Sequence, residues 1–384
     1  MLQLCGACAR SAPKKSKPPY LDGNGHVNFE MDDPDNPRNW SAGYRWLITT
    51  IATLLATNAN FASSAPSGAN VSLAEHFGVS ELAAGLVMTM FLLGFCAGPL
   101  LVAPLSEFYG RQGIFYKTFF GYVIFTFLCT WAPNFGAMLV GRFITGTLVS
   151  SGLSNAPGVI ADLWDVEDRG DAMALFSAMT WLGTSLAPII GGFCELKKDW
   201  RWSFYVLLWL GGGSAILMLL IPETHGPTIL RRRAIAVRKA KMPGYENVRA
   251  PVEDNSPSLL GIYKISLIRP WALLFDPISF ACAVYVSISV GLYYMLFNIF
   301  PLVFQDMRGW NAGVGQLPLL GAVVGSVVAG LMVVVDTKRL LRKTKKMNIR
   351  FGDLTPEERL PLAMVGGIGL SASMFWFSWS AQYK

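Results

Sequence analysis

Nine long apolar segments, separated by short polar ones, constrain this 384-residue chain more than any other feature. A helix needs about 20 apolar residues to cross a bilayer, and the segments approach or exceed that length. Only 15% of the residues are charged, fewer than a soluble domain carries. Because a bilayer core admits only helices and closed barrels, we predict an all-α membrane protein. The segments are residues 46–66, 81–102, 114–131, 136–161, 172–194, 202–221, 277–302, 312–335 and 361–381.

The basic residues are distributed unequally between the polar segments. If the N-terminus is inside, 26 of the 32 Lys and Arg residues lie on the cytoplasmic side and four lie in outer loops. Cytoplasmic loops of membrane proteins carry this excess, so we predict a cytoplasmic N-terminus. The same distribution accounts for the net charge of +7 without a nucleic-acid partner.

The order of apolar and polar segments predicts four regions. Residues 1–45 are polar and rich in Pro and Lys, and we expect a disordered cytoplasmic tail. Residues 46–221 hold six apolar segments, which predict an N-terminal six-helix bundle. Residues 222–270 form a cytoplasmic linker, in which 231–241 is expected to be a basic amphipathic helix, either on the inner leaflet or solvated. Residues 271–384 hold three further segments.

A short charged turn, A-P-L-S-E-F-Y-G-R, joins the second and third apolar segments at residues 103–111. Gly110 permits a tight turn, and Glu107 and Arg111, four residues apart, are expected to pair on one helical face. The turn resembles the signature loop between helices 2 and 3 of the major facilitator superfamily, G-x-L-[AS]-[DE]-x-x-G-R-[RK], in the form found in fungal drug:proton antiporters. The leading Ala and Gln112 depart from this pattern.

Three further segments resemble that group of antiporters. They are N-P-R-N-W-S at residues 36–41, P-E-T-H-G-P-T-I-L at 222–230 and P-E-E-R-L-P at 356–361. The resemblance implies twelve helices in two bundles of six. We therefore expect a complete N-terminal bundle plus three helices of the C-terminal bundle, in a chain truncated after helix 9. A truncated product, a gene-model fragment and a degenerate copy would each explain the length.

Arg142 is the strongest candidate for a functional residue. It lies about six residues into the fourth apolar segment, roughly 9 Å below the outer surface at 1.5 Å per residue. A charge at that depth normally faces a bundle interior or a cavity. The residue resembles the R-x-x-x-G element of helix 4, which the resemblance links to proton coupling. The alternative is a side chain that snorkels to the outer headgroups.

The fifth apolar segment contains G-T-S-L-A-P-I-I-G-G, which resembles the antiporter element G-x-x-x-G-P-x-x-G-G. Small residues four apart let helices approach closely, and a proline inside a helix can kink it. We expect a hinge or a seal against leakage there, with generic small-residue packing as the alternative. The residues are Gly183, Ala187, Pro188, Gly191 and Gly192.

Charged residues are expected to gather at the inner surface of the first bundle. Asp162 ends the fourth segment near Glu107, Gly110 and Arg111. In relatives such groups form a charge cluster that holds the outward-facing state, so the resemblance implies this role here. An ordinary solvated acid is the alternative for Asp162. Asp276 precedes Pro277 and is expected to cap a helix.

Polar and aromatic residues on the spans are candidates for substrate contact. The resemblance places them on the inward faces of the helices, whereas tyrosines near span ends also form interfacial belts. The candidates are Asn58, Asn60, Asn155, Tyr293, Tyr294 and Asn298. Asn70 begins an N-V-S glycosylation sequon in a predicted outer loop.

The resemblance implies proton-coupled export of small amphipathic or cationic compounds, such as drugs, polyamines or toxins, by alternating access. One alternative is an inactive fragment or regulatory partner of a full-length transporter, and another is a proton-coupled nutrient importer. We expect no enzyme activity, since no phosphate-binding loop or catalytic constellation appears, and no metal or cofactor. The expected partners are the substrate, protons and a bilayer, and the expected form is a monomer in the plasma or vacuolar membrane.

Overall fold

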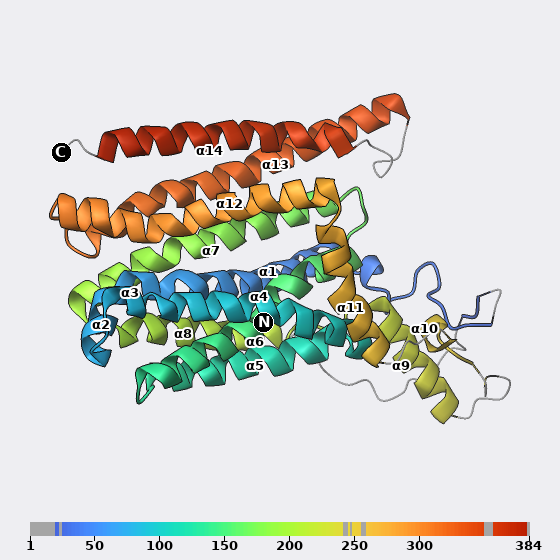
Figure 1. Ribbon diagram of the computed structural model, residues 1–384. Coiled ribbons are helices and arrows are strands. Elements are labelled where there is room, and N and C mark those ends of the chain that lie inside the picture. The colour runs from blue at the N-terminus through green and yellow to red at the C-terminus, as the bar shows by residue number, and fades with distance from the viewer. Residues whose placement is uncertain are drawn as a thin grey trace.

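The chain folds into long helices that run side by side (Figure 1). The computed structural model describes residues 20–22, 25–240, 245, 248–254, 259–348 and 356–381. Within those residues the backbone forms helices and two isolated β-bridges, with no sheet. The prediction of an all-α fold is confirmed.

Six long helices form the N-terminal half and enclose one continuous hydrophobic core. They are α1 (Ala42–Ser64), α4 (Leu86–Tyr109), α5 (Arg111–Thr130), α6 (Phe135–Leu163), α7 (Arg169–Lys197) and α8 (Arg201–Met218). Three short helices join α1 to α4, namely η3 (Ala65–Ala69), α2 (Asn70–Phe77) and α3 (Glu81–Ala84). All six apolar segments expected in this half therefore form helices.

Seven helices in the described part of the chain are long and apolar enough to cross a membrane by length and composition alone. The two helices of the N-terminal half that fall outside this group are α1 and α8. Asn58 and Asn60 interrupt the apolar run of α1, and α8 is short and begins with Arg201. These two helices depend on their neighbours to bury polar side chains.

The second half contains the other three predicted spans, α12 (Pro277–Phe300), α13 (Leu320–Met347) and α14 (Leu360–Ala381). Asp276 accepts a hydrogen bond from the Ser279 amide at 3.0 Å, which confirms its predicted role as the helix cap. Between the spans lie η4, a π-helical turn (Pro301–Met307), and the short helices η5 (Val314–Leu319) and η7 (Pro356–Arg359).

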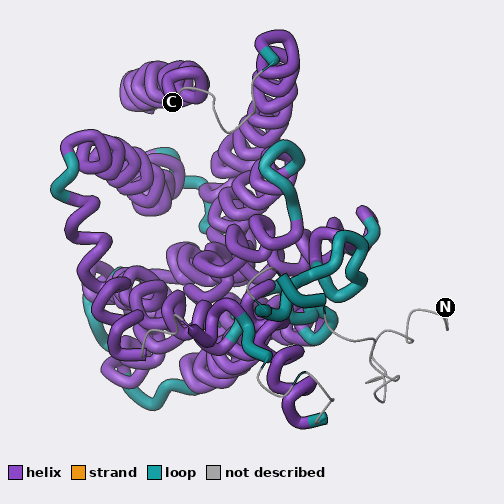
Figure 2. The backbone as a smooth tube through the Cα atoms, turned by 90° about the vertical axis from the view of Figure 1, so that its right-hand side faces the viewer, coloured by secondary structure: helices purple, strands orange, loops and turns teal. Residues whose placement is uncertain are grey.

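The helices of the second half are buried to very different degrees. α13 packs along α7, whereas α14 has no buried residue and lies at the edge of the molecule (Figure 2). α13 also continues about three turns beyond the predicted segment 312–335, because its last part is polar and a hydropathy pattern does not register it. The polar extension is therefore a continuation of the same helix beyond its apolar segment.

The tail and linker lie at one end of the bundle (Figure 1). The linker holds α9 (Gly226–Lys239), α10 (Pro251–Asp254) and α11 (Leu259–Leu274), and the tail holds η2 (Pro37–Asn39). The predicted basic helix is therefore α9. The linker boundary predicted at residue 270 falls inside α11.

The prediction of a disordered tail is wrong for residues 25–41, while residues 1–19, 23 and 24 lie outside the described part. Arg233 on α9 donates two hydrogen bonds to Asp33, at 2.6 and 3.0 Å, and one to Asp35 at 2.6 Å. Val27 is fully buried against α9 beside Leu230. The pairing partners are 200 residues apart, so composition could not indicate them.

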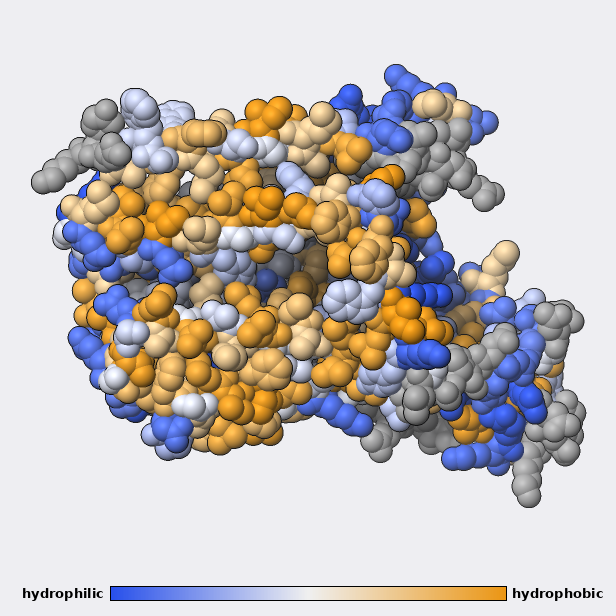
Figure 3. Space-filling view, viewed as in Figure 1, coloured by the Kyte–Doolittle hydropathy of each residue, from blue (hydrophilic) through white to orange (hydrophobic). Residues whose placement is uncertain are grey.

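The surface shows which part of the molecule meets lipid. An apolar band crosses both halves, and polar residues gather over the tail and linker (Figure 3). Large apolar side chains such as Ile278, Ile368 and Trp376 are more than 70% exposed. An exposed band of this size fits a multi-pass integral membrane protein.

Candidate functional site

A charge network connects the first residue of α5 to the C-terminal end of α6. Arg111, the first residue of α5, donates from Nε to Asp162 Oδ2 on α6 at 2.6 Å. The guanidinium lies directly over Gly158, where any side chain would collide with it. Gly158 stands one turn before Asp162, so the missing side chain and the carboxylate together form a seat for Arg111. The predicted proximity of Arg111 and Asp162 is present in the structure.

The expected pair between Glu107 and Arg111 is absent from the described ion pairs, and Glu107 is exposed. Gly110 ends α4 with φ +95°, so the two residues no longer share one helical face. Glu223 takes the position instead, because its Oε1 accepts a hydrogen bond from the Arg111 amide at 3.0 Å. A Cβ at Gly110 would collide with Glu223 Oε2. Position 110 therefore requires glycine for two reasons: its positive φ angle, and the absence of space for a side chain.

Glu223 is the residue of this network that the sequence analysis missed. Its side chain is 6% exposed, and it also binds the His225 amide at 3.2 Å and Arg232 at 3.4 Å. The adjacent Gln112 donates to the Ile221 carbonyl at 3.0 Å. The sequence signal for Glu223 is its place in the P-E-T segment, which resembles the fungal antiporters. The network thus ties the α4–α5 turn to the start of the linker.

His225 borders this network. Its Nδ1 lies 2.8 Å from Thr228 Oγ1, and the side chain is partly buried. Burial, and then the nearby positive charge of Arg111, hold the pKa of His225 below its ordinary value of 6.5. The cations of the network are Arg111, paired with Asp162, and Arg232, paired with Glu223.

Two other arginines bind the C-terminal end of α6 and do not join the pair with Asp162. Arg169 donates to the carbonyls of Ala161 and Trp164 at 3.2 and 3.4 Å. Arg45 donates to the Leu163 carbonyl at 3.4 Å, with its guanidinium 4.5 Å from the ring centre of Trp164. Cations at a helix C-terminus satisfy the last carbonyls and the helix dipole. This arrangement fixes where α6 ends.

Arg142 lies inside the N-terminal half with 1% of its surface exposed. It donates to the Ala62 carbonyl on α1 at 2.8 Å and to the Val87 carbonyl on α4 at 3.2 Å. Its guanidinium carbon is 4.3 Å from the ring centre of Phe91 and 5.7 Å from that of Phe204. The side chain faces the bundle interior, and the snorkelling alternative is not supported.

The environment of Arg142 is unusual for a buried cation. None of the ion pairs among the described residues includes it. Buried charges are normally paired, because carbonyls and ring faces compensate only part of the lost hydration. Arg142 is therefore a costly residue in a site that offers it dipoles and no opposite charge.

The small residues of α7 let three segments approach its backbone. A Cβ at Gly183 would lie 2.8 Å from the Thr57 carbonyl oxygen on α1, and one at Gly191 would lie 2.7 Å from the Ala65 carbonyl oxygen on η3. One at Gly192 would lie 2.6 Å from the Ala312 carbonyl oxygen, before η5 in the second half.

The remaining two residues of the motif, Ala187 and Pro188, are buried within the same stripe. The motif on α7 therefore sits at a junction between the two halves. A hinge or seal stays a prediction, with generic small-residue packing as the alternative, and the contact made at Gly192 joins the two halves.

Tyrosines of α12 meet the N-terminal half at the same junction. Tyr293 and Ser185 on α7 share a hydrogen bond of 2.5 Å between their hydroxyls, and Tyr294 and Ser63 on α1 share one of 2.9 Å. Asn298 is exposed and lies one turn further along α12. These three candidates therefore lie together at the junction between the two halves and do not form a belt at the membrane–water boundary.

A cavity of about 200 Å³ opens between α4, η3 and α12. The face of the molecule is hollowed between α12 and the N-terminal half (Figure 3). Polar and apolar side chains both line the cavity, a mixture that suits an amphipathic ligand. The lining residues include Ser67, Asn70, Met88, Thr89, Tyr294 and Asn298.

The three asparagines proposed for substrate contact in the N-terminal half differ in their surroundings. Asn58 donates to Ser214 Oγ at 3.2 Å and accepts from the Tyr122 hydroxyl at 3.0 Å, so its amide is occupied between α1, α5 and α8. Asn60 donates to the Ala56 carbonyl of its own helix at 3.0 Å. The Nδ2 of Asn155 is buried without a hydrogen-bond partner. The structure assigns Asn58 to packing and leaves Asn155 as the asparagine with free donor capacity.

The sequon at Asn70 does not lie in an open loop. Asn70 is the first residue of α2 and is half-buried at the cavity. The hydroxyl and amide of Ser72 both donate to Glu195 Oε1, at 2.8 and 3.1 Å. Glycosylation at Asn70 stays a prediction, made less favourable by this packing. No group of three potential metal ligands occurs among the described residues.

Comparison with known proteins places this geometry in a family. The Major Facilitator Superfamily profile matches residues 49–383. The efflux pump FUBT of Fusarium oxysporum is 38% identical over 92% of this chain and 59% of its own length. The multidrug transporter mdrA of Aspergillus fumigatus is also 38% identical, over 92% of this chain and 58% of its own. The chain thus spans about three fifths of these relatives.

Solved structures show the same fold. A proton:xylose symporter, XylE, aligns with a TM-score of 0.54 at 18% identity, over 78% of this chain and 70% of its own. Identity this low supports the fold alone. The prediction that the chain is not an enzyme is confirmed by its relationship to transporters. With six helices around Arg142, the glycine turn at Gly110 and these relatives in agreement, the chain belongs to the Major Facilitator Superfamily, and its relatives include fungal efflux pumps.

Proposed function

We propose that this protein exports small amphipathic compounds from the cytoplasm in exchange for protons, by alternating access. The observation that carries the proposal is Arg142, a buried cation held by carbonyls of α1 and α4, with no carboxylate partner in the described part of the chain. The names of the relatives support the direction of transport, since they are efflux pumps and multidrug transporters.

Arg142 suits proton coupling because its neighbours belong to different helices. A change in its hydrogen bonds would move α1 relative to α4, since one bond goes to each. A proton or substrate group that enters nearby changes the electrostatic balance in a medium of low dielectric constant. Binding that favours one arrangement of the helices then shifts the population of that state.

Alternating access requires the two halves to move against each other around a central site. The close contacts at Gly192 and the hydroxyl bonds of Tyr293 and Tyr294 are the groups that would separate when the outer side opens. The network of Arg111, Asp162 and Glu223 would hold the inner ends of the N-terminal half together in that state.

The substrate class follows from the junction. Aromatic rings, hydroxyls and the amide of Asn298 line it, and such surfaces bind amphipathic or cationic compounds. We propose drugs, polyamines and toxins as the class. We also propose a monomer in the plasma membrane, where export would remove the compounds from the cell, with a cytoplasmic N-terminus, which the basic residues favour.

The test is transport by the full chain in a yeast strain that lacks its own drug exporters. Cells are loaded with a fluorescent amphipathic cation, and its loss is followed with and without a protonophore. We expect faster loss that the protonophore abolishes. Arg142→Gln should reach the membrane and reduce transport at least tenfold, and Arg142→Lys should restore part of it.

The control is Arg201→Gln, which removes a partly exposed arginine of the proposed outer side, paired with Asp199 at 2.7 Å. It should transport normally. Uptake in place of loss would favour the nutrient importer. A chain that reaches the membrane and transports nothing, but co-purifies with a full-length relative, would favour the regulatory partner.

A further inference from the structure

The cytoplasmic end of α13 presents five cations on one side of the helix. At 100° per residue they fall within an arc of about 140°. The opposite side is buried through Leu340 and Thr344, which are 7% and 3% exposed. The five cations are Lys338, Arg339, Arg342, Lys343 and Lys346.

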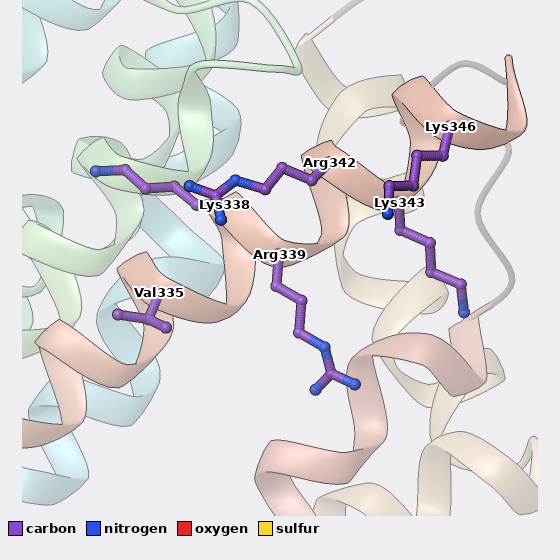
Figure 4. Close-up of a pocket in the computed structure, with 6 residues that line it drawn as sticks. All are labelled: Val335, Lys338, Arg339, Arg342, Lys343 and Lys346. Atoms are coloured by element: carbon purple, nitrogen blue, oxygen red, sulfur yellow. The ribbon is translucent and has the colours of Figure 1, made fainter.

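These five side chains line a groove with a volume of about 480 Å³, and Val335 is its remaining lining residue. Arg339 and Lys343 extend toward the start of α14, and Lys338 and Arg342 extend away from it (Figure 4). All five are exposed. Among the described residues one ion pair involves the set, between Lys343 and Glu358 on η7 at 2.5 Å.

Four cations therefore share a groove without a carboxylate partner in the described part of the chain. Cations one turn apart on a helix repel each other. Lys338 and Lys346 are eight residues apart, or about 12 Å along the axis, so one ligand can reach all of them. An anion with several charges would convert this repulsion into attraction.

The position of the groove indicates the source of the anion. α13 leaves its apolar segment at Val335, and Leu331 and Met332, one turn earlier, are exposed. The groove therefore begins where a spanning helix emerges from the hydrocarbon on its basic side, which is the cytoplasmic side. Phosphates of inner-leaflet lipids lie at this depth, and basic pockets on that side bind them.

We propose that this groove binds the headgroup of an inner-leaflet phospholipid that carries several phosphates, of the phosphoinositide class. The cations contact the headgroup phosphates, and the exposed apolar residues before Val335 contact the acyl chains. A single phosphate would leave most of the five cations uncompensated. The site is separate from the junction that carries the proposed transport, so it can be tested by binding alone.

The experiment uses the full chain in nanodiscs of phosphatidylcholine, with or without 5% phosphatidylinositol bisphosphate. Bound lipid is counted by native mass spectrometry, and affinity is measured with a fluorescent phosphoinositide. The variant Lys338→Gln/Arg342→Gln/Lys346→Gln should weaken binding about 100-fold, at about fivefold per charge. The control Lys239→Gln/Lys264→Gln/Arg269→Gln removes three exposed cations from the linker and should leave binding unchanged.

Higher salt should weaken binding to the unchanged chain, because exposed charges are screened. Equal affinity in the triple variant of the groove would overturn the proposal, as would equal loss in the linker control. Soluble inositol trisphosphate that displaces the lipid at equal concentration would also overturn it, by identifying a soluble anion as the ligand.

Discussion

At the residue scale, the ion pair between Arg111 and Asp162 differs from a nearby surface pair by burial. Their side chains are 16% and 20% exposed, whereas Arg38 and Asp165 are 52% and 65% exposed. Breaking a buried pair leaves an uncompensated charge, and an exposed pair contributes little. The two aspartates lie three residues apart, so they provide a matched comparison.

We predict that Asp162→Asn lowers the stability of the chain by about 1–3 kcal/mol, since it leaves Arg111 partly buried without its anion. Asp165→Asn should change stability by less than about 1 kcal/mol. Thermal unfolding of both variants in the same detergent measures the difference. Equal midpoints would show that the Arg111 pair has no structural role.

Gly110 provides a second comparison at this scale. Gly110→Ala would place a methyl group against Glu223 at φ +95°, and we expect a loss of about 1–3 kcal/mol. Gly113→Ala, in the next turn, meets no atom within 4 Å and should be neutral or stabilising by up to about 1 kcal/mol. The thermal midpoint should therefore fall for Gly110→Ala and should stay unchanged or rise for Gly113→Ala.

At the element scale, α7 depends on its glycines for contact with α1 and η3. Gly191→Ala would bring a methyl group to 2.7 Å from the Ala65 carbonyl, which belongs to the backbone and cannot rotate away. We predict a lower thermal midpoint and weaker transport. Gly212→Ala on α8 meets open space and is the control. An unchanged thermal midpoint and unchanged transport in Gly191→Ala would show that the backbone around Ala65 can move to accept the methyl group.

The docking of the tail on α9 has a pH dependence of defined sign. Hydrogen bonds from Arg233 hold the pKa of Asp33 below its ordinary value of 3.8. A depressed pKa contributes stability above pH 3.8, and that contribution is lost as the pH falls through the lower folded-state value. The docked tail should therefore persist at pH 5.

Amide hydrogen exchange of residues 25–35, corrected for intrinsic rates, measures this docking. Protection should be equal at pH 7 and pH 5 and should fall below pH 3.8. Arg233→Gln should remove protection at every pH, and Lys239→Gln, an exposed residue of the same helix, should not. Loss of protection between pH 7 and pH 5 would show that the docking depends on groups other than Asp33, since Asp33 stays ionised in that range.

At the scale of the whole molecule, the distribution of Lys and Arg predicts which side each end occupies. A cysteine introduced at Ser41, just before α1, should react with a membrane-impermeant maleimide only after the membrane is opened. One at Lys198, between α7 and α8, should react in intact cells. The reverse pattern would invert the proposed topology.

The sequence by itself determined the long apolar helices, although α13 continues to Met347, beyond its apolar segment, and α11 crosses the predicted linker boundary. Apolar length and composition are local properties, and all nine predicted segments form helices, seven of which are long and apolar enough by themselves to cross a membrane. The same holds for the cap at Asp276 and for the depth of Arg142 along α6. The resemblance of short motifs was likewise local, and the comparisons confirm the family.

The tertiary structure decided which groups meet. Glu223 replaces Glu107 beside Arg111, Gly158 forms a seat for the guanidinium, and Asn58 is taken up by packing. The tail docks on α9 through a pair 200 residues apart. Each outcome depends on the rotation of one helix about its axis and on the neighbour that rotation presents. A hydropathy pattern contains the length of a helix, but it does not contain its rotation or its partners.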